Sequence, residues 1–321
     1  MTSTPAFVRP SRAVTIWRLL LAAVAVAVPA WVGLTRFEVL RAGHPAYPMV
    51  LGGLALVGLV LLVLTVVRPP RPAQRRLLVG VGRVLLTTLV VLLAAASAWL
   101  RPFPSTEAGA RVAAGDGAGV VVQDDTTRTT LRPGGASPTV GLIFQPGARV
   151  DHRAYLPLLT RIAAAGTLVV VIKQPLDVGL LAINEPESVI AAHPEISRWV
   201  VGGHSLGGVA ASQYAAAHAD KVVGLLLWAS YPLDSLAGRT DLQVTSISGT
   251  RDAFTTPADV AKSRGLLPAQ TTFVAVEGGI HSYFGDYGRQ PGDGDPAIDR
   301  EVAQDQIVEA SVALLDKVGQ E

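Results

Sequence analysis

The 321-residue chain contains no cysteine. This absence excludes disulfide bonds, thiolate metal sites and a cysteine nucleophile, but it excludes no cellular compartment. Charged residues are also few, at 16%, whereas 50% of the residues are hydrophobic, which is unlike an ordinary soluble domain. No basic patch interleaved with aromatic residues occurs in the sequence, so we expect no nucleic-acid partner.

The hydrophobic excess lies in the first hundred residues, which hold three long apolar runs at about 14–34, 49–67 and 77–100. Each run is long enough to cross a hydrocarbon layer of about 30 Å as a helix. A cleaved signal peptide would explain the first run but not the other two. Buried core helices are the alternative, although long uncharged apolar runs rarely occur in soluble proteins. We predict a membrane anchor over residues 1–100, with three transmembrane helices in contact with membrane lipids.

Positive charge is unevenly distributed around these runs. The arginines cluster before the first run and between the second and third runs, at Arg9, Arg12, Arg68, Arg71, Arg75 and Arg76. The loop between the first two runs is less positive because Glu38 offsets part of its charge. Since positively charged loops remain in the cytoplasm, we predict a multi-pass protein of the cell membrane. Its N-terminus would be cytoplasmic and everything after the third run extracytoplasmic.

The remainder of the chain has a different pattern. Residues 101–119 lack apolar periodicity and are rich in Gly, Ala and Pro, which predicts a flexible linker. From residue 120 to residue 321, strand and helix patterns alternate, which predicts an α/β domain with a mostly parallel sheet flanked by helices. We expect strands at 120–123, 127–132, 140–144, 168–172, 199–201, 222–229, 244–248 and 272–276, and helices at 153–165, 186–192, 209–218, 257–264 and 299–318.

One short stretch of this domain indicates chemistry. A strand pattern at 199–201 runs into Gly-Gly-His-Ser-Leu-Gly-Gly and then directly into a helix pattern. Strand, Gly-x-Ser-x-Gly and helix together are typical of a nucleophile elbow. Ser205 would be the nucleophile on a strained turn, preceded by His204, while Gly203 and Gly207 avoid collisions with the neighbouring strand and helix. The five-residue motif alone can arise by chance in a glycine-rich chain. The strand before it, the helix after it and the candidate triad partners downstream are therefore what indicate a catalytic serine.

A serine nucleophile needs a base, and the base needs an acid that orients it. Asp252 follows a strand pattern, where catalytic loops gather in open α/β sheets. Asp234 and Asp241 follow an earlier strand and are weaker candidates. His281 follows the last strand and completes the chain order Ser, Asp, His. We therefore predict Ser205, His281 and Asp252 as a triad, the alternatives being an Asx turn at the aspartate and a packed histidine.

The negative oxygen that forms during attack on a carbonyl needs donors fixed in advance. The N–H of Leu206, at the start of the helix after the serine, is one predicted donor. The second would come from the loop after the strand at 140–144. Because Pro146 in that loop has no N–H, either Gly147 or Ala148 must supply the donor, and we favour Ala148.

Four further residues are candidates for substrate contact because they lie at strand ends or beside the predicted base: Gln145, Lys173, Phe284 and Tyr287. A solvated loop position is the alternative for Lys173. The loop Asp293-Gly294-Asp295 lacks the full ligand spacing of a calcium site, which favours a solvated turn. We expect no metal and no cofactor.

Several segments resemble the α/β-hydrolase family, in particular a compact bacterial branch of it: FQPGARVDHRAY, VVGGHSLGG, LLLWASYP, ISGTRDAFTTP and VEGGIHSYFGDYG. The resemblance begins at about residue 140. It implies the α/β-hydrolase fold, with Ser205 as nucleophile, His281 as base and Asp252 as acid. The chain departs from the branch at Ile280, where Asn commonly precedes the histidine, and in the oxyanion loop, where the usual His-Gly is absent.

These observations predict a membrane-anchored serine hydrolase that cleaves small-molecule or lipid carboxylic esters through an acyl-enzyme. The gap between residues 230 and 242 is too short for a cap domain, so we expect an open site. An acyltransferase or thioesterase on the same triad is one alternative. A catalytically inactive binding protein with the hydrolase fold is the other.

Overall fold

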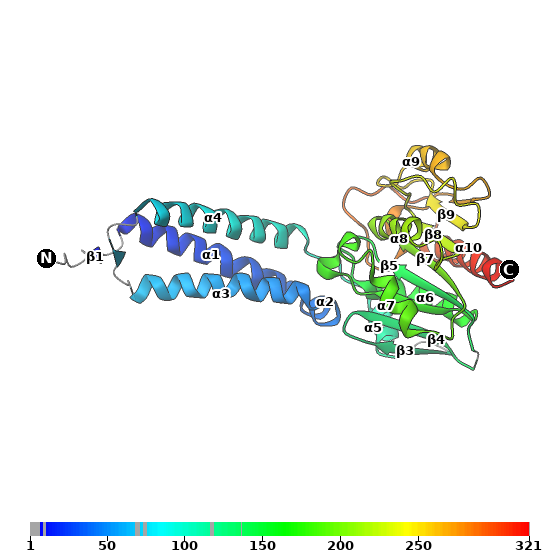
Figure 1. Ribbon diagram of the computed structural model, residues 1–321, viewed down its shortest axis with the longest axis horizontal. Coiled ribbons are helices and arrows are strands. Elements are labelled where there is room, and N and C mark those ends of the chain that lie inside the picture. The colour runs from blue at the N-terminus through cyan, green and yellow to red at the C-terminus, as the bar shows by residue number, and fades with distance from the viewer. Residues whose placement is uncertain are drawn as a thin grey trace. The chain divides into compact units, whose positions relative to one another are not determined.

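The computed structural model describes residues 7–8, 11–67, 71–72, 76–115, 119–135 and 137–320. The chain divides into two compact units, Met1–Arg101 and Pro102–Glu321 (Figure 1). Arg9, Arg68 and Arg75, on which part of the predicted membrane orientation depends, lie outside the described residues.

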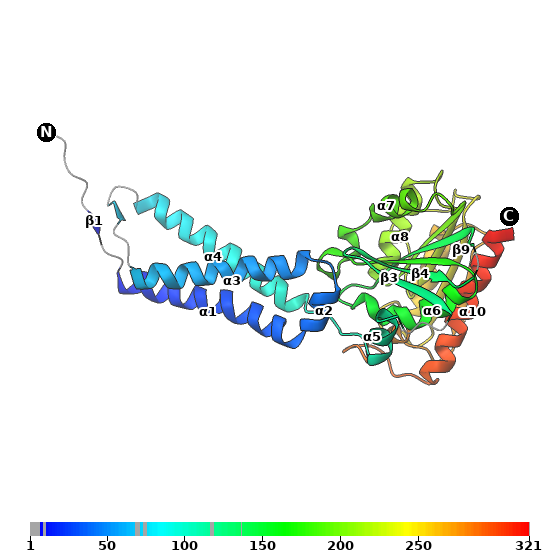
Figure 2. The same ribbon diagram turned by 90° about the horizontal axis from the view of Figure 1, so that it is seen from below.

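The first unit is helical. Its elements are α1 (Arg12–Thr35), α2 (Phe37–Ala42), α3 (Ala46–Val67) and α4 (Arg76–Trp99), with a short antiparallel pairing of β1 (Phe7–Val8) and β2 (Arg71–Pro72). Three stretches, Arg12–Thr35, Ala46–Val67 and Leu78–Trp99, are long and apolar enough to span a membrane, with mean hydropathies of 2.0, 2.9 and 2.3. The helices α1, α3 and α4 run alongside one another (Figure 2). Their length and composition agree with the three predicted spans and suggest membrane association.

A close approach between α1 and α3 holds this bundle together. Gly58 in α3 lies against Val26 and Ala25 in α1, and a Cβ at Gly58 would lie 2.7 Å from a Val26 methyl group. Small residues permit such close contact between transmembrane helices, where van der Waals packing replaces the hydrophobic effect. A side chain at position 58 would therefore require Val26 or one of the two helices to shift.

The second unit is built on an eight-stranded sheet with the order β10-β9-β8-β7-β5-β6-β4-β3. The strands are β3 (Val120–Asp124), β4 (Arg128–Pro133), β5 (Val140–Gln145), β6 (Leu168–Ile172), β7 (Arg198–His204), β8 (Gly224–Trp228), β9 (Gln243–Gly249) and β10 (Thr272–Val276). Strands β5 to β10 are parallel, and only β4 pairs antiparallel, with β3 and with β6. The prediction of a mostly parallel sheet is confirmed, and each predicted strand is present.

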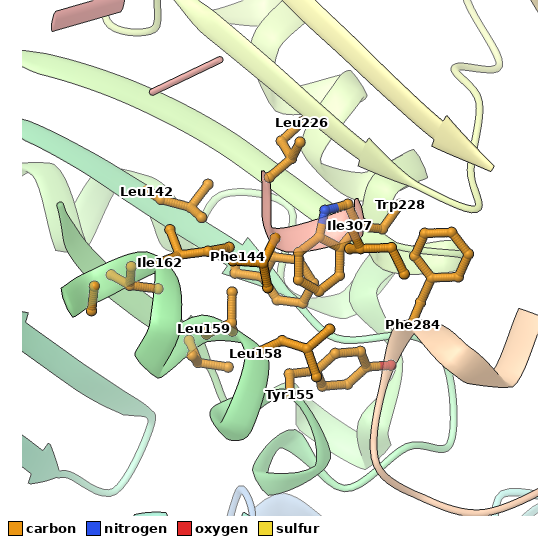
Figure 3. Close-up of a cluster of buried hydrophobic side chains, with 14 of the residues drawn as sticks. Leu142, Phe144, Tyr155, Leu158, Leu159, Ile162, Leu226, Trp228, Phe284 and Ile307 are labelled. Atoms are coloured by element: carbon orange, nitrogen blue, oxygen red, sulfur yellow. The ribbon is translucent and has the colours of Figure 1, made fainter. Parts of the chain in front are cut away.

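Helices cover both faces of this sheet, as predicted. They are α6 (Leu156–Ala164), α7 (Glu185–Ala192), α8 (Leu206–Ala217), α9 (Pro257–Ser263) and α10 (Arg300–Gln320), with short 3-10 turns η2 (His152–Tyr155), η3 (Pro175–Asp177), η4 (Gly179–Leu181), η5 (Arg264–Leu266) and η6 (His281–Phe284). Side chains alternate between the faces along a strand: Phe144 joins the core under α6 and α10, whereas Ile143 joins the core under α7 and α8. Figure 3 shows the first of these cores, where Phe144 packs among Tyr155, Trp228 and Ile307.

The first residues of the second unit differ from their prediction. Residues 102–115 were expected in a flexible linker, but α5 (Glu107–Ala113) packs on η2 and α6. Phe103 forms a β-bridge with Val150. A Cβ at Gly109 would collide with the carbonyl of Arg153, so this glycine serves close packing. The linker prediction was wrong for residues 102–115, and residues 116–118 lie outside the described part.

Candidate active site

The turn between β7 and α8 holds Ser205 in a strained conformation. Its φ is 52° and its ψ is −124°, a region that residues with a side chain rarely occupy. Two contacts to the next strand and its loop maintain the turn. The Ser205 N–H donates to the carbonyl of Trp228 at 3.0 Å, and the Ser230 hydroxyl donates to the Ser205 carbonyl at 2.7 Å. The surroundings therefore fix the serine as an elbow requires.

The two glycines around this turn are required by the end of β5. A Cβ at Gly203 would lie 2.5 Å from the carbonyl oxygen of Gln145, and a Cβ at Gly207 would collide with the carbonyls of Gln145 and Pro146. Backbone atoms at the end of β5 and within the turn itself therefore lie too close to leave room for a side chain. Only glycine fits at either position.

An acid–base pair lies at the same edge of the sheet. Nδ1 of His281 and Oδ2 of Asp252 are 2.8 Å apart, and both residues are buried. The other oxygen of Asp252 accepts the N–H groups of Phe254 at 2.8 Å and Thr255 at 2.7 Å. The Asx turn considered as an alternative is therefore present, and it orients the carboxylate toward the imidazole. With Nδ1 engaged in this way, Nε2 of the ring is the atom left to exchange a proton with a reactant.

A second carboxylate holds the backbone of the histidine. Asp293 accepts the N–H of His281 at 3.2 Å and the N–H of Ser282 at 2.8 Å. It also accepts the N–H of Gly294 at 2.8 Å. The sequence pattern around Asp293 indicated only a solvated turn, so this positioning role was missed. Because its partners are backbone groups eleven or twelve residues away, no side-chain motif could have revealed it.

The elbow and the histidine loop meet through a ring contact. The ring centroids of His204 and His281 are 4.4 Å apart, so the proposed base touches the residue before the serine. Among the described residues, no hydrogen bond joins Ser205 to His281. Such catalytic hydrogen bonds are often long without substrate and tighten in the reacting complex.

The backbone donors expected for an oxyanion also have defined surroundings. The Gly147 N–H donates to the Tyr155 hydroxyl at 2.9 Å, so it is already used within the protein. No hydrogen bond from the N–H of Ala148 is found in the described part of the chain. The N–H of Leu206 lies at the first position of α8, where helix donors have no partner within the helix. Of the two alternatives in the loop after β5, the geometry favours Ala148.

Burial sets the protonation of the groups behind the elbow. The pKa of His204 lies well below its usual value because the ring is buried and because His281 is close, so His204 is neutral near pH 7. Burial also raises the pKa of the Tyr155 hydroxyl, which therefore keeps its proton. Phe284 stacks on His204 with ring centroids 5.7 Å apart. The rings that pack around His204, those of Tyr155 and Phe284, are therefore uncharged, as is His204 itself.

The structure places the four residues predicted to contact substrate in buried surroundings. Gln145 is fully buried and donates to the Ala182 carbonyl at 3.3 Å. Lys173 is 4% exposed and pairs with Asp124 at 3.0 Å. Phe284 and Tyr287 are buried in the core. All four side chains are thus buried, Gln145 and Lys173 at strand ends and Phe284 and Tyr287 in the segment that begins at His281. Their contact with a substrate stays a prediction.

Comparison with known proteins finds a protein family whose model matches this chain. The alpha/beta hydrolase family model matches residues 141–305, just over half of the chain. A predicted CIB-like hydrolase from Thermoplasma acidophilum superposes with a TM-score of 0.46 at 16% identity, covering 62% of this chain and 100% of that chain. TT1662 from Thermus thermophilus superposes with a TM-score of 0.47 at 14% identity, covering 63% and 99%. No curated protein sequence matches the chain.

Proposed function

The chain belongs to the alpha/beta hydrolase family, and from this premise we propose that it is a membrane-anchored serine hydrolase that cleaves carboxylic esters. The observation that carries the proposal is the hydrogen bond of 2.8 Å between His281 and Asp252, at the sheet edge where the strained turn at Ser205 ends β7. A buried carboxylate behind an imidazole, next to a strained serine, is the arrangement that activates a hydroxyl for acyl transfer.

In the proposed reaction, Oγ of Ser205 attacks the ester carbonyl carbon while Nε2 of His281 takes the hydroxyl proton. The tetrahedral intermediate then expels the alcohol, which receives that proton from His281. Water attacks the acyl-enzyme, again giving its proton to His281, and the carboxylic acid leaves as the proton returns to Ser205. Asp252 holds the ring through Nδ1 and stabilises its charged form throughout.

The proposed oxyanion hole consists of the N–H groups of Leu206 and Ala148. Loss of one such donor costs about a hundredfold to a thousandfold in kcat in serine hydrolases. The bond from Gly147 to Tyr155 supports this choice, because it commits the neighbouring N–H and fixes the loop in place.

The proposed anchor consists of α1, α3 and α4, with the N-terminus in the cytoplasm and the catalytic unit outside. The arginine distribution in the sequence supports this orientation. A reporter that is active only outside the cytoplasm, fused after Glu321, is expected to be active. A silent reporter beside an active cytoplasmic one would reverse the orientation.

Activity-based labelling tests the catalytic proposal. A fluorophosphonate probe should label the full-length protein at Ser205, and labelling should be lost in Ser205→Ala but retained in Ser235→Ala, which changes an exposed serine. Asp252→Asn should lower kcat about ten-thousandfold, because the ring loses its orienting acid. Labelling that persists in Ser205→Ala would refute the nucleophile.

Three outcomes of labelling and turnover assays separate the rival functions. An ester product that forms when an alcohol acceptor is added would identify an acyltransferase, and selective cleavage of thioesters would identify a thioesterase. Folded protein with neither labelling nor turnover over a panel of esters would favour the inactive binding protein.

A further inference from the structure

The second unit exposes few large apolar side chains, and most of them lie at one edge. Over the described residues, the six that are strongly exposed are Val121, Leu180, Leu181, Leu233, Phe254 and Val302. Leu180 and Leu181 follow the carboxyl end of β6, Leu233 follows that of β8, and Phe254 follows that of β9. Because carboxyl ends of parallel strands meet at a single edge, these four residues gather on the side of Ser205. We call them the apolar rim, with exposures of 41%, 56%, 59% and 42% in chain order.

Contacts place the apolar rim around the proposed catalytic residues. A Cβ at Gly179, directly before the two leucines, would lie 3.3 Å from Cα of Gly207 in the elbow. The Phe254 ring is 5.2 Å from the ring of His281. Leu233 lies three residues after Ser230, whose hydroxyl contacts the Ser205 carbonyl. Exposed apolar surface around a site, without a cap domain to cover it, marks an interaction surface.

The chain reaches this edge directly from the third span. That span ends at Trp99, which is 66% exposed, and Trp31 near the end of α1 is 46% exposed. Tryptophans at helix ends mark the membrane–water interface. Only three residues lie between Trp99 and Phe103, so their Cα atoms are at most about 14 Å apart.

Phe103 is then bound to the loops of the candidate site. Its N–H donates to the Arg149 carbonyl at 2.6 Å, and its carbonyl accepts the Asp151 N–H at 3.0 Å, on either side of the bridge to Val150. The Thr106 N–H donates to the Asp286 carbonyl at 2.8 Å, in the loop after His281. The loops of the candidate site are therefore bound to a segment that begins only a few residues after the end of the third span.

We propose that the apolar rim inserts into the headgroup–acyl boundary of the bilayer, and that the enzyme takes lipid-like esters directly from that surface. Insertion would remove the exposed leucine and phenylalanine side chains from water. Burial of such apolar side chains is what binds interfacial proteins to the bilayer surface. The choice of substrate rests on the proposed function, whereas docking of the rim does not.

The absence of cysteine allows docking to be measured separately from catalysis. Leu181→Cys, Leu233→Cys and Val121→Cys, each labelled with an environment-sensitive dye, are compared in the full-length protein in phosphatidylcholine vesicles that contain headgroup spin-labelled lipid. Val121 is 62% exposed and lies near the amino end of β6 in the register, so it is the matched control. Dyes at 181 and 233 should shift to shorter wavelength and be quenched by the lipid, while the dye at 121 stays in water. Dyes at 181 and 233 that remain in water, or that shift without quenching by lipid, would overturn the proposal.

Activity then tests the substrate class. Methylumbelliferyl palmitate embedded in the vesicles is compared with soluble methylumbelliferyl acetate for wild type, for Leu181→Ser with Leu233→Ser, and for Val121→Ser. The double variant should lose about tenfold on the embedded ester and less than about twofold on the soluble ester, and the control should lose neither. Equal losses on both esters would overturn the membrane-surface substrate and leave the hydrolase intact. Turnover of neither ester by wild type, together with failed labelling of Ser205, would instead overturn the proposed function.

Discussion

The hydroxyl of Tyr155 lies 2.9 Å from Nδ1 of His204. The same hydroxyl accepts the N–H of Gly147 at 2.9 Å. One side chain from η2 therefore joins the residue before the serine to the loop that carries the proposed oxyanion donor. In the proposed reaction these two segments close around one carbonyl group, and Tyr155 joins them through its hydroxyl.

Tyr155→Phe should separate catalysis from folding. The ring would keep its place against Phe144, where the centroids are 5.2 Å apart, but Gly147 and His204 would lose a buried partner. We expect a loss of about 1–3 kcal/mol in stability and a fall of about tenfold in kcat with little change in KM. Steady-state ester hydrolysis and thermal unfolding measure the two effects.

Tyr214→Phe is the control, because it removes a hydroxyl that donates to Glu187 at 3.0 Å, away from the site. It should leave kcat unchanged. An equal kcat for Tyr155→Phe and wild type would show that the link does not position the oxyanion loop.

Asp293→Asn tests the carboxylate that caps the histidine loop. An amide in place of Oδ2 cannot accept the N–H of Ser282, so the backbone at His281 should become less ordered. We expect a fall of about tenfold in kcat and in the rate of fluorophosphonate labelling, with KM nearly constant. Asp295→Asn serves as the control, because the side chain of Asp295 is 86% exposed and pairs with Arg289 at the surface. Similar kinetics for the two variants would contradict a positioning role.

Much of this architecture could be predicted from the sequence, because apolar periodicity depends on local spacing alone. The three spans and the parallel sheet follow from run length and from alternation, and the positions of Asp252 and His281 after strands anticipated that they lie together. The roles of Tyr155 and Asp293 could not be predicted. Their partners are backbone N–H groups and, for Tyr155, also Nδ1 of His204, which only the tertiary fold brings near.

The sequence-based error in residues 102–115, and the unforeseen burial of Gln145 and Lys173, also have physical causes. Glycine and alanine in residues 102–115 are equally suited to a flexible chain and to a tight contact, and composition does not distinguish the two. Gln145 and Lys173 stand at strand ends, where a side chain can turn inward as readily as outward. Buried partners, Ala182 and Asp124, determine the direction.

Gly207→Ala should disrupt the elbow. The added methyl group would collide with two carbonyl oxygens at the end of β5, and backbone atoms cannot move aside without breaking the sheet. We expect a loss of about 3 kcal/mol or more in stability and no labelling of Ser205. Gly265→Ala is the matched control, since nothing lies within 4 Å of the position its Cβ would take. A folded Gly207→Ala protein that labels at the wild-type rate would contradict this account of the turn.

We expect the stability of the folded state to depend on pH through Asp177. Burial, and then the charge of Asp151, raise the pKa of its carboxyl from 3.8 to about 8. Because the folded pKa exceeds the unfolded one, the folded state binds more protons, and the stabilisation from protonated Asp177 is lost as the pH rises from about 4 to about 8. Asp177→Asn removes this loss, and asparagine tolerates the φ of 54° at this position.

The thermal midpoint of Asp177→Asn should therefore exceed that of wild type by more at pH 8 than at pH 5. Asp241→Asn is the control, because a hydrogen bond from Arg239 lowers the pKa of Asp241. The contribution of Asp241 to stability is therefore complete above its unfolded pKa, and the difference between Asp241→Asn and wild type should be nearly the same at pH 5 and pH 8. A difference between Asp177→Asn and wild type that does not vary with pH would refute the assignment.

The strap from Pro102 to α5 has a consequence for how the enzyme could leave the membrane. A protease that cut at residue 119 would detach Phe103 from Arg149 and Asp151, and the freed loop would lose the backbone pairing that shapes it. An active released form would require a cut between Trp99 and Pro102, at the very end of the span. We therefore expect the proposed hydrolase to keep its activity only in forms that retain the chain from Pro102 onward.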